Sequence, residues 1–319
     1  WPYSTIQAGV NAAGASLAVE ACVVVRDNAV YSEQVTVQNI VMNNHRLRIM
    51  SDLALSSAAT VNPPRFSTAA FHVMNDSVTI QYMSVITTNS VAYGVRASSA
   101  YATLATLKVD SGGGITTAGI AVSSWATVAS ASVTVQSAHG LFLSGRNNSV
   151  SNSDFAAANS GFYAVFASGA SSNTFTVVFA SSTAGGGMKL GSNANGNSVS
   201  QSSFTTDSTS EAGIWIQGSS SNSFTQAHAY SKGNTGYTIS AAGQYNSLTL
   251  AVAVSADPAN YGLSMAQSHY NSVSQSFLLN LGGGRAAILA SDSNYNSLSQ
   301  TTIAANAASV AALEINDCY

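Results

Sequence analysis

Residues 222–249, NSFTQAHAYSKGNTGYTISAAGQYNSLT, hold one complete unit of a repeat and the start of the next. The units open at Asn222 and Asn246, and each asparagine is followed by Ser or Thr, an apolar residue, and Ser or Thr again. This pattern occurs seven times in steps of 24 or 25 residues, at Asn148, Asn173, Asn197, Asn222, Asn246, Asn271 and Asn296. Self-similarity at a fixed period is typical of solenoid proteins.

Each repeat contains two or three short strands. Alternating apolar and polar residues after the asparagine predict a strand with one buried face. A second strand opens with glycine, as in GIWIQGS at Gly213, and a third apolar position lies seven residues past several asparagines, as at Phe204. We therefore predict an all-β chain that forms a single right-handed parallel β-helix of about ten or eleven coils, with a short amino-terminal capping helix.

The seven asparagines are predicted to form a column. Equivalent positions of stacked coils lie above one another, so each inward amide can donate a hydrogen bond to the carbonyl of the next. This ladder explains why a polar residue holds a core position. The outward Ser and Thr residues are expected to form a flat, hydroxylated face.

The repeat weakens toward the amino terminus. Three earlier segments keep the spacing approximately but lack an asparagine at the repeat position: NDSVTIQ at residues 75–81, ATLATLKV from Ala102 and ATVASASV from Ala126. No linker interrupts the chain, so we predict one domain over residues 1–319. It divides into a cap (1–20), degenerate coils (21–147) and regular asparagine-ladder coils (148–319).

The amino-terminal segment resembles a known superfamily. YSTIQAGVNAA from Tyr3, VVVRDNAVYSEQVTVQ from Val23 and LRIMSD from Leu47 are similar to the opening of pectin-lyase-like β-helix proteins, which include pectin methylesterases. The later asparagine units resemble NosD-like repeats. The resemblance implies a capping helix, with Ser4 as its cap, Ile6 and Val10 over the end of the core, and a structural role for Glu33.

Composition excludes several functions. Only 7% of the residues are charged, against roughly 25% in typical soluble domains. The net charge of −3 provides no basic field for nucleic acid, and no apolar run of 18 residues predicts a membrane span. The sequence begins with Trp1 and not with Met, so we expect a secreted, extracellular product whose signal peptide has been removed.

No catalytic motif is evident. Enzymes of the superfamily carry clusters of Asp, Arg, Lys or His, and their esterase, polygalacturonase, lyase and epimerase motifs are absent here. Asp207, Lys232 and Asp257 are 25 residues apart and are predicted to stack, either as weak catalytic or sugar-binding candidates or as a salt-bridge ladder on an exposed column. No metal-ligand spacing occurs, and no cofactor is predicted. Some aromatic residues either stack on sugars or pack in the core: Trp125, Trp215, Tyr163 and Tyr237.

The two cysteines, Cys22 and Cys318, are predicted to lie at opposite ends of the solenoid. A disulfide requires Cα atoms within about 7 Å, so pairing within one molecule is excluded by this prediction. An intermolecular disulfide between Cys22 and Cys318 of successive molecules is one interpretation. The alternatives are that each cysteine is a buried or free thiol, or that the carboxy-terminal tail folds back.

Low charge, end-placed cysteines and the missing catalytic motif favour a non-catalytic extracellular structural or surface protein. We predict a β-solenoid subunit of a sheath, surface layer, filament or coat, assembled head-to-tail with itself or bound to a cell-surface polymer. The first alternative is a carbohydrate-active or carbohydrate-binding β-helix, a lyase, esterase or hydrolase relative with a polysaccharide partner. The second is a Ser/Thr ligand face for adhesion or ice binding.

Overall fold

A computed structural model describes residues 3–307, 310–316 and 318. The chain is a right-handed parallel β-helix with one short helix, as the repeat predicted. It divides into two compact units, residues 1–155 (unit 1) and 156–319 (unit 2). The extent of a single domain over residues 1–319 stays a prediction. Trp1, on which the expectation of a trimmed product rests, lies outside the described residues.

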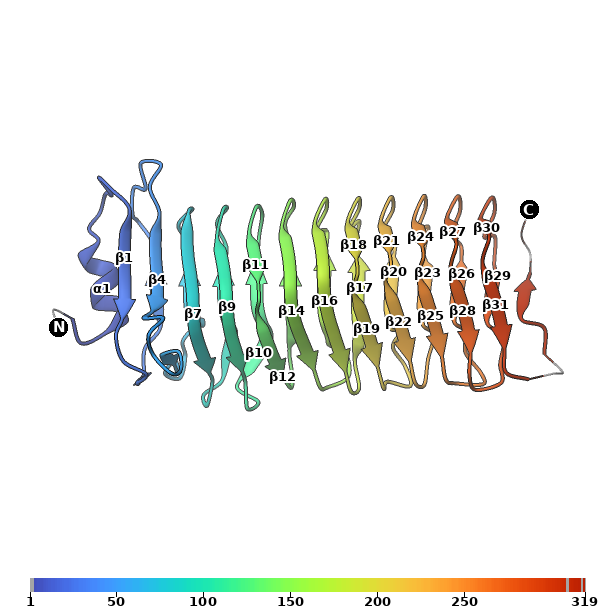
Figure 1. The fold of residues 1–319 in the computed structure, drawn as a ribbon, viewed down its shortest axis with the longest axis horizontal. Helices are drawn as coiled ribbons and strands as arrows, with labels where there is room; N and C mark the ends of the chain where they lie inside the picture. Colours follow the sequence, from blue (N-terminus) through green and yellow to red (C-terminus); the bar gives the residue numbers. More distant parts are fainter. Residues whose placement is uncertain (1–2, 308–309, 317, 319) are drawn as a thin grey trace. The chain divides into compact units, whose positions relative to one another are not determined.

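Unit 1 begins with the helix α1 (Ile6–Ala12), which lies beside the first strand (Figure 1). The strands form two sheets. The strands of the sheet next to the predicted asparagine column are named the asparagine-side strands. In unit 1 these are β1 (Ala21–Val25), β2 (Val30–Tyr31), β4 (Leu47–Ser51), β5 (Thr60–Val61), β7 (Val78–Ile86), β9 (Thr103–Asp110), β11 (Thr127–Ala129), β12 (Ser132–Val135) and β14 (Ser149–Ala157). The strands on the opposite side of the coil are named the glycine-side strands. In unit 1 these are β3 (Val35–Val37), β6 (Ala69–Val73), β8 (Val91–Ala97), β10 (Ile115–Val122) and β13 (His139–Leu143).

The degenerate coils of unit 1 keep the register of the repeat. Thr79 pairs with Thr103, Thr103 with Thr127, and Thr127 with Ser149, all in parallel. Ala126 therefore occupies the same column as Asn148, and its backbone N–H donates to the Asn148 Oδ1 at 2.7 Å. Small apolar residues replace the asparagine here because they fill the same buried position.

The capping helix has its N-cap one residue later than predicted. Thr5, not Ser4, has extended backbone geometry, and its side chain accepts a hydrogen bond from the Ala8 N–H at 3.0 Å. Both oxygens of the Glu33 carboxylate accept from the first turn, from the Ile6 N–H at 2.8 Å and the Gln7 N–H at 3.0 Å. Ile6 and Val10 are buried over the end of the core.

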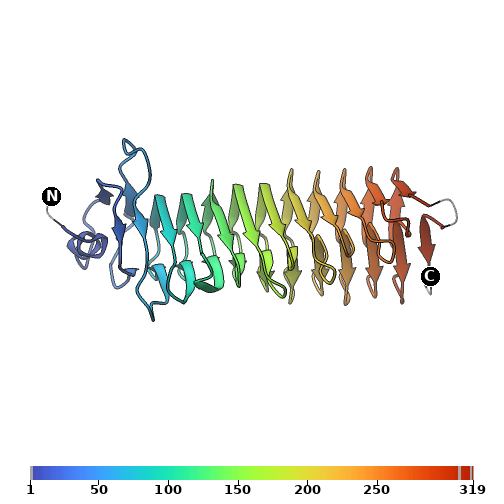
Figure 2. The same ribbon diagram turned by 90° about the horizontal axis from the view of Figure 1, so that it is seen from below.

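Unit 2 is more regular, and successive coils place equivalent strands side by side (yellow to red in Figure 2). Its asparagine-side strands are β16 (Thr174–Ser182), β18 (Ser198–Ser200), β19 (Ser203–Thr206), β21 (Ser223–Thr225), β22 (His228–Ser231), β24 (Ser247–Thr249), β25 (Val252–Ser255), β27 (Ser272–Ser274), β28 (Phe277–Asn280), β30 (Ser297–Ser299) and β31 (Thr302–Ala305). Its glycine-side strands are β15 (Tyr163–Ser168), β17 (Gly186–Gly191), β20 (Ile214–Gln217), β23 (Tyr237–Ser240), β26 (Leu263–Ala266), β29 (Ala287–Ala290) and β32 (Leu313–Ile315).

The asparagines of unit 2 form a hydrogen-bonded ladder inside the coils. Asn197 Nδ2 donates to Asn222 Oδ1 at 3.0 Å, and Asn222 Nδ2 donates to Asn246 Oδ1 at 3.0 Å. The same bond joins Asn173 to Asn197, Asn246 to Asn271 and Asn271 to Asn296, at 2.9, 3.0 and 3.1 Å. Each Oδ1 also accepts the backbone N–H of the preceding asparagine, as between Asn197 and Asn222 at 2.9 Å. The ladder satisfies polar groups that would otherwise be costly to bury.

One glycine-side strand per coil gives about 12 coils, slightly more than predicted. The prediction was low because the first coils of unit 1 carry neither the asparagine nor the regular spacing.

Candidate functional site

The outer face of the glycine-side strands in unit 2 brings a cation, a carboxylate and aromatic rings together. The Lys189 Nζ lies 3.8 Å from the ring centroid of Trp215 and 5.3 Å from that of Tyr163. The Tyr163 hydroxyl donates to the Glu211 Oε2 at 2.6 Å. We name Tyr163, Lys189, Glu211 and Trp215 the Lys189 cluster.

Strand register and glycine place these side chains. Phe166 of β15 pairs with Lys189 of β17, which pairs with Trp215 of β20, so the three occupy one outward column. Tyr163 pairs with Gly186, and a Cβ on that glycine would lie 2.4 Å from the Tyr163 ring. Gly186 is therefore required for the ring to lie against β17. The Trp215 Nε1 donates to the Ser240 Oγ at 2.9 Å, which fixes the indole plane.

Burial shifts the pKa values of Lys189 and Tyr163 in the cluster. Desolvation lowers the pKa of Lys189, and the charge of Glu211 partly offsets that effect. Desolvation raises the pKa of Tyr163, and its hydrogen bond to Glu211 and the charge of Glu211 raise it further. Tyr163 thus stays a hydrogen-bond donor, whereas Lys189 loses its proton more readily than an ordinary lysine.

A related arrangement occurs on the glycine-side strands of unit 1. The Arg96 Cζ lies 5.1 Å from the Tyr93 ring centroid, and His72 pairs with Arg96 on the adjacent strand. Burial and the charge of Arg96 both lower the pKa of His72. The strands β3, β6, β8, β10 and β13 contain no Asp or Glu. In unit 2, Lys189 is the single charged residue of the glycine-side strands before Glu314 of β32.

Of the predicted column of Asp207, Lys232 and Asp257, only Asp207 and Lys232 occupy equivalent positions on adjacent coils. Thr206 pairs with Ser231, so Asp207 and Lys232 follow equivalent positions. Ser231 pairs with Ser255, which places Ala256 and not Asp257 at the next equivalent position. Asp257 instead orders its own turn, where its Oδ1 accepts from the Ala259 N–H at 2.7 Å and its Oδ2 accepts from the Asn260 side chain at 3.1 Å. A local structural role therefore accounts for both Asp257 carboxylate oxygens.

The remaining sequence candidates are scattered. Cys22 and Cys318 are both free thiols in this chain, and pairing between molecules stays a prediction. Tyr237 is fully buried and its hydroxyl donates to the Ala227 carbonyl at 3.2 Å, so it belongs to the core. Trp125 is exposed and stacks on Tyr101 with ring centroids 5.9 Å apart.

Within residues 3–307, 310–316 and 318, no three His, Cys, Asp or Glu side chains gather as a metal site. The one helix in that part of the chain is too short to cross a bilayer.

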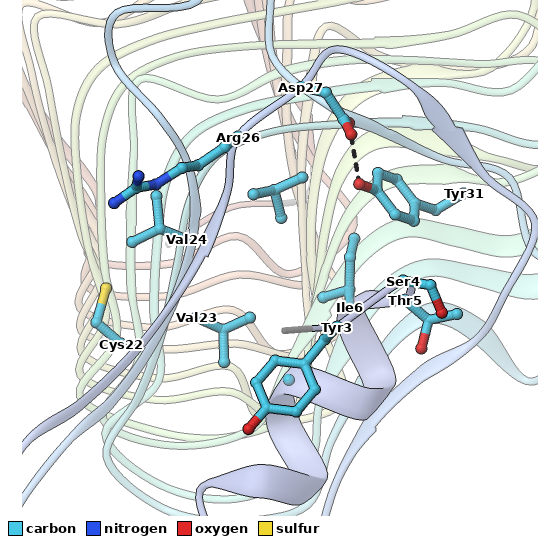
Figure 3. Close-up of a pocket in the computed structure, with 12 residues that line it drawn as sticks. Tyr3, Ser4, Thr5, Ile6, Cys22, Val23, Val24, Arg26, Asp27 and Tyr31 are labelled. Atoms are coloured by element: carbon cyan, nitrogen blue, oxygen red, sulfur yellow. Dashed lines mark hydrogen bonds between the residues drawn. The ribbon is translucent and has the colours of Figure 1, made fainter. Parts of the chain in front are cut away.

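A cavity of about 720 Å³ lies between α1 and β1 (Figure 3). Valine side chains of β1 and Ile6 line it, and the Tyr31 hydroxyl donates to the Asp27 Oδ1 at 2.9 Å at its edge. Burial and Asp27 raise the pKa of Tyr31 to about 12, and burial raises the pKa of the Cys22 thiol despite the opposing charge of Arg48. The Tyr31 hydroxyl is engaged by Asp27 and burial favours the protonated thiol of Cys22. The Lys189 cluster, which joins a cation, a carboxylate and aromatic rings, is therefore the stronger candidate.

Sequence reasoning missed the link between Tyr163 and Glu211. These residues are 48 positions apart, which corresponds to two coils, and Glu211 lies in a turn that precedes its strand. A search for charged residues at twice the repeat length from an aromatic residue would have found the pair.

The chain resembles known proteins in structure and not in sequence. No protein-family model matches the sequence, and no curated protein matches it. Among solved structures, the A-module of the mannuronan C-5 epimerase AlgE6 of Azotobacter vinelandii is similar at 12% identity and a TM-score of 0.46, over 97% of this chain and 94% of that one.

Two further structures are similar over part of their own length. The bacteriophage CBA120 tailspike protein 3 has 11% identity and a TM-score of 0.44, over 94% of this chain and 54% of the tailspike. The catalytic domain of a GH87 alpha-1,3-glucanase in complex with nigerose has 10% identity and a TM-score of 0.41, over 88% of this chain and 63% of that domain.

These structures correct the leading functional prediction. They are an epimerase, a tailspike and a glucanase, not structural subunits of sheaths. The prediction of a non-catalytic sheath, surface-layer, filament or coat subunit is therefore wrong. It relied on the absence of superfamily motifs, and that absence does not exclude a site built from other residues, such as the Lys189 cluster.

Proposed function

We propose that this chain is an extracellular, pectin-lyase-like β-helix protein that binds acidic polysaccharide through the Lys189 cluster. The observation that carries the proposal is the Lys189 ammonium at 3.8 Å from the Trp215 ring, beside the Tyr163–Glu211 hydrogen bond. A cation held against aromatic rings offers a charge for a sugar carboxylate and an apolar surface for the sugar ring.

The distribution of charge supports an anionic ligand. The chain has a net charge of −3, yet the glycine-side strands carry Arg96, Lys189 and no acidic residue apart from Glu314. Glu314 pairs with Arg285 at 2.5 Å, so its charge is compensated. Glu211 is the acid at the Lys189 cluster, and its carboxylate accepts from the Tyr163 hydroxyl. Elsewhere along these strands an acidic polymer would meet little repulsion.

The superfamily assignment is supported by the cap. Glu33 lies in the segment YSEQV that resembles pectin-lyase-like proteins, and its carboxylate accepts both N–H groups at the start of α1. The chain has only ten lysines and arginines, seven in unit 1 and three in unit 2. Proteases that cut after basic residues would therefore find few sites, which suits an extracellular protein.

Affinity electrophoresis through gels that contain polygalacturonate or alginate tests the proposal, with dextran as the neutral polymer. We expect Lys189→Ala and Trp215→Ala each to weaken binding about ten-fold, since an ion-assisted contact contributes about 1.5–3 kcal/mol. Lys232→Ala is the matched control, because it removes an exposed lysine of the same unit that lies outside the cluster.

Two results would reject the proposal: wild-type protein that migrates equally in acidic and neutral gels, or Lys189→Ala protein that is retarded as strongly as wild type. Release of reducing ends from the same polymers separates cleavage from binding alone.

A further inference from the structure

Three tyrosines of unit 2 form a stacked row on the surface. The ring centroids of Tyr245 and Tyr270 are 5.1 Å apart with planes at 8°, and those of Tyr270 and Tyr295 are 5.0 Å apart at 7°. Each tyrosine directly precedes a ladder asparagine, and the three residues are 58%, 46% and 67% exposed. We name them the tyrosine ladder.

The backbone of this turn is left-handed in every coil of unit 2 that carries a ladder asparagine. The φ angles of Tyr245, Tyr270 and Tyr295 are +55°, +56° and +57°. This left-handed conformation costs an L residue about 1–2 kcal/mol relative to the right-handed one, and glycine avoids that cost. Earlier coils of unit 2 place small residues at the same turn position: Ser172, Gly196 and Ser221.

The left-handed backbone does not by itself explain the tyrosines. Ser172 and Ser221 have φ angles of +55° and +58° at the same turn position, so a smaller side chain bears the same backbone cost. Stacking contributes only about 0.5–1.5 kcal/mol per pair. The exposed row of rings, and not the turn, is therefore the feature that offers a ligand a surface.

Polar, uncharged residues flank each tyrosine of the ladder, and the nearest acid in sequence is the exposed Asp292. Half-exposed Gln244, His269 and Asn294 precede the tyrosines. The His269 Nδ1 accepts the Asn294 N–H at 3.1 Å. Residues 244–250, 269–275 and 294–300 include no Lys, Arg, Asp or Glu. Amide, imidazole and hydroxyl groups are the hydrogen-bonding partners that sugar hydroxyls require.

We infer that the tyrosine ladder is a second binding site, for an uncharged, extended β-1,4-linked glycan that lies along the row. The advance per sugar in such a chain is close to the ring spacing of 5.0–5.1 Å, so each coil would contact one sugar. Neighbouring rings cover both faces of Tyr270, so the glycan meets ring edges and phenolic hydroxyls. Weak contacts repeated along a polymer add to a useful affinity.

This inference is independent of the acidic-polysaccharide proposal. The tyrosine ladder lies in turns before asparagine-side strands, whereas the Lys189 cluster lies on glycine-side strands. It also requires no charge on the ligand.

The test is retention on insoluble cellulose, with competition by soluble cellohexaose, for wild type and for Tyr245→Ser/Tyr270→Ser/Tyr295→Ser. Serine already occupies this turn position at Ser172 and Ser221, so the coils tolerate it. We expect at least a ten-fold loss of cellulose affinity, with binding to acidic polymers unchanged. Phe179→Ser/Phe277→Ser is the matched control, because it removes exposed aromatic rings outside the ladder and should leave retention intact.

Several outcomes would overturn the inference: no retention of wild type, equal retention of the triple variant, no competition by cellohexaose, or loss of cellulose binding in Lys189→Ala. The last outcome would assign neutral glycans to the Lys189 cluster. Failure of the acidic polymers alone would reject the proposed function and leave the tyrosine ladder standing.

Discussion

At the scale of single residues, the asparagine ladder pairs polar groups that would be costly to bury without hydrogen bonds. Asn222 is 1% exposed, accepts from both the backbone and the side chain of Asn197, and donates to Asn246. A hydrophobic residue would keep only its backbone N–H bond to the Asn246 Oδ1. We expect Asn222→Ala to lower the free energy of unfolding by about 2–4 kcal/mol, because it leaves two buried N–H donors of Asn197 unpaired and removes one of the two donors to the Asn246 Oδ1.

Urea unfolding followed by circular dichroism measures this effect. Ser223→Ala is the control, because Ser223 lies next to Asn222 but points outward, and its midpoint should match wild type. An Asn222→Ala midpoint equal to that of the control would show that the ladder contributes little.

Left-handed residues offer a second prediction. Leu250 has a φ of +53° and is 46% exposed, so it bears a backbone cost with little burial in return. Asn152 occupies the equivalent turn position in unit 1 with a φ of +48°. We expect Leu250→Asn to stabilise the protein by about 0.5–1 kcal/mol, because asparagine tolerates this conformation. Thermal unfolding tests it against Thr249→Asn, a strand substitution that should not stabilise.

The lowered pKa of Lys189 predicts how binding depends on pH. An acidic polymer requires the ammonium form, so affinity should fall as pH rises, and at a lower pH than for an ordinary lysine. Lys189→Arg should keep its affinity over the same range, since arginine loses its proton only above about 12. Titration by calorimetry on polygalacturonate compares the two, and an identical pH profile would contradict the assignment.

Unfolding does not confound that measurement. A lysine whose pKa is lowered on folding binds fewer protons in the folded state, so this group makes unfolding less favourable as pH rises. Tyr163 and Tyr237 act in the opposite sense, because their raised pKa values remove stability as pH rises through the ordinary tyrosine range. The titration should therefore stay below about pH 10, the usual pKa of tyrosine.

At the scale of elements, α1 depends on a residue distant in sequence. The Glu33 carboxylate accepts the N–H groups of Ile6 and Gln7, and the Gln7 side chain bonds the backbone of Thr36 on β3. We expect Glu33→Gln to destabilise the cap by about 1–2 kcal/mol, because the amide keeps one acceptor oxygen and no charge. Hydrogen exchange of α1 amides measures the effect. Glu20→Gln, an exposed acid nearby, should leave that exchange unchanged.

The strands were predictable from sequence to different degrees. Repeats such as NSFT and NSLT made the asparagine-side strands of unit 2 evident, because inward and outward positions alternate. Ser4 was named as the cap in place of Thr5 because both residues can accept the hydrogen bond and only the backbone angles distinguish them. The third member of the Asp207 column was misplaced because one coil has 24 residues and not 25, which moves a side chain by one position.

The candidate site was less predictable than the strands. Tyr163 and Glu211 meet across two coils, and the repeat spacing alone does not show which side chains extend from a turn toward a strand. Tyr245, Tyr270 and Tyr295 were visible in the sequence, but their left-handed backbone and parallel rings were not.

At the scale of the whole molecule, each coil mainly contacts its neighbours, so stability should be close to a sum over coils and interfaces. Deleting residues 246–270 removes β24, β25 and β26 and joins Tyr245 directly to Asn271. We expect the shortened protein to fold, with β-sheet circular dichroism and protease resistance retained, because equivalent strands can pair again.

Deletion of residues 246–257 is the control. It removes half a coil, which takes the following strands out of register and exposes buried faces. An unfolded product from the full-coil deletion, or a folded one from the half-coil deletion, would contradict the modular description.

The asparagine ladder also gives unit 2 an electrical direction. From Asn173 to Asn271, each of the side-chain amides Asn173, Asn197, Asn222, Asn246 and Asn271 donates one N–H to the asparagine oxygen of the next coil. Dipoles aligned in this way reinforce one another, as in the peptide units of a helix, and each polarises the next. A chain with very few charges thus contains a buried row of amide oxygens that all face the same end of unit 2.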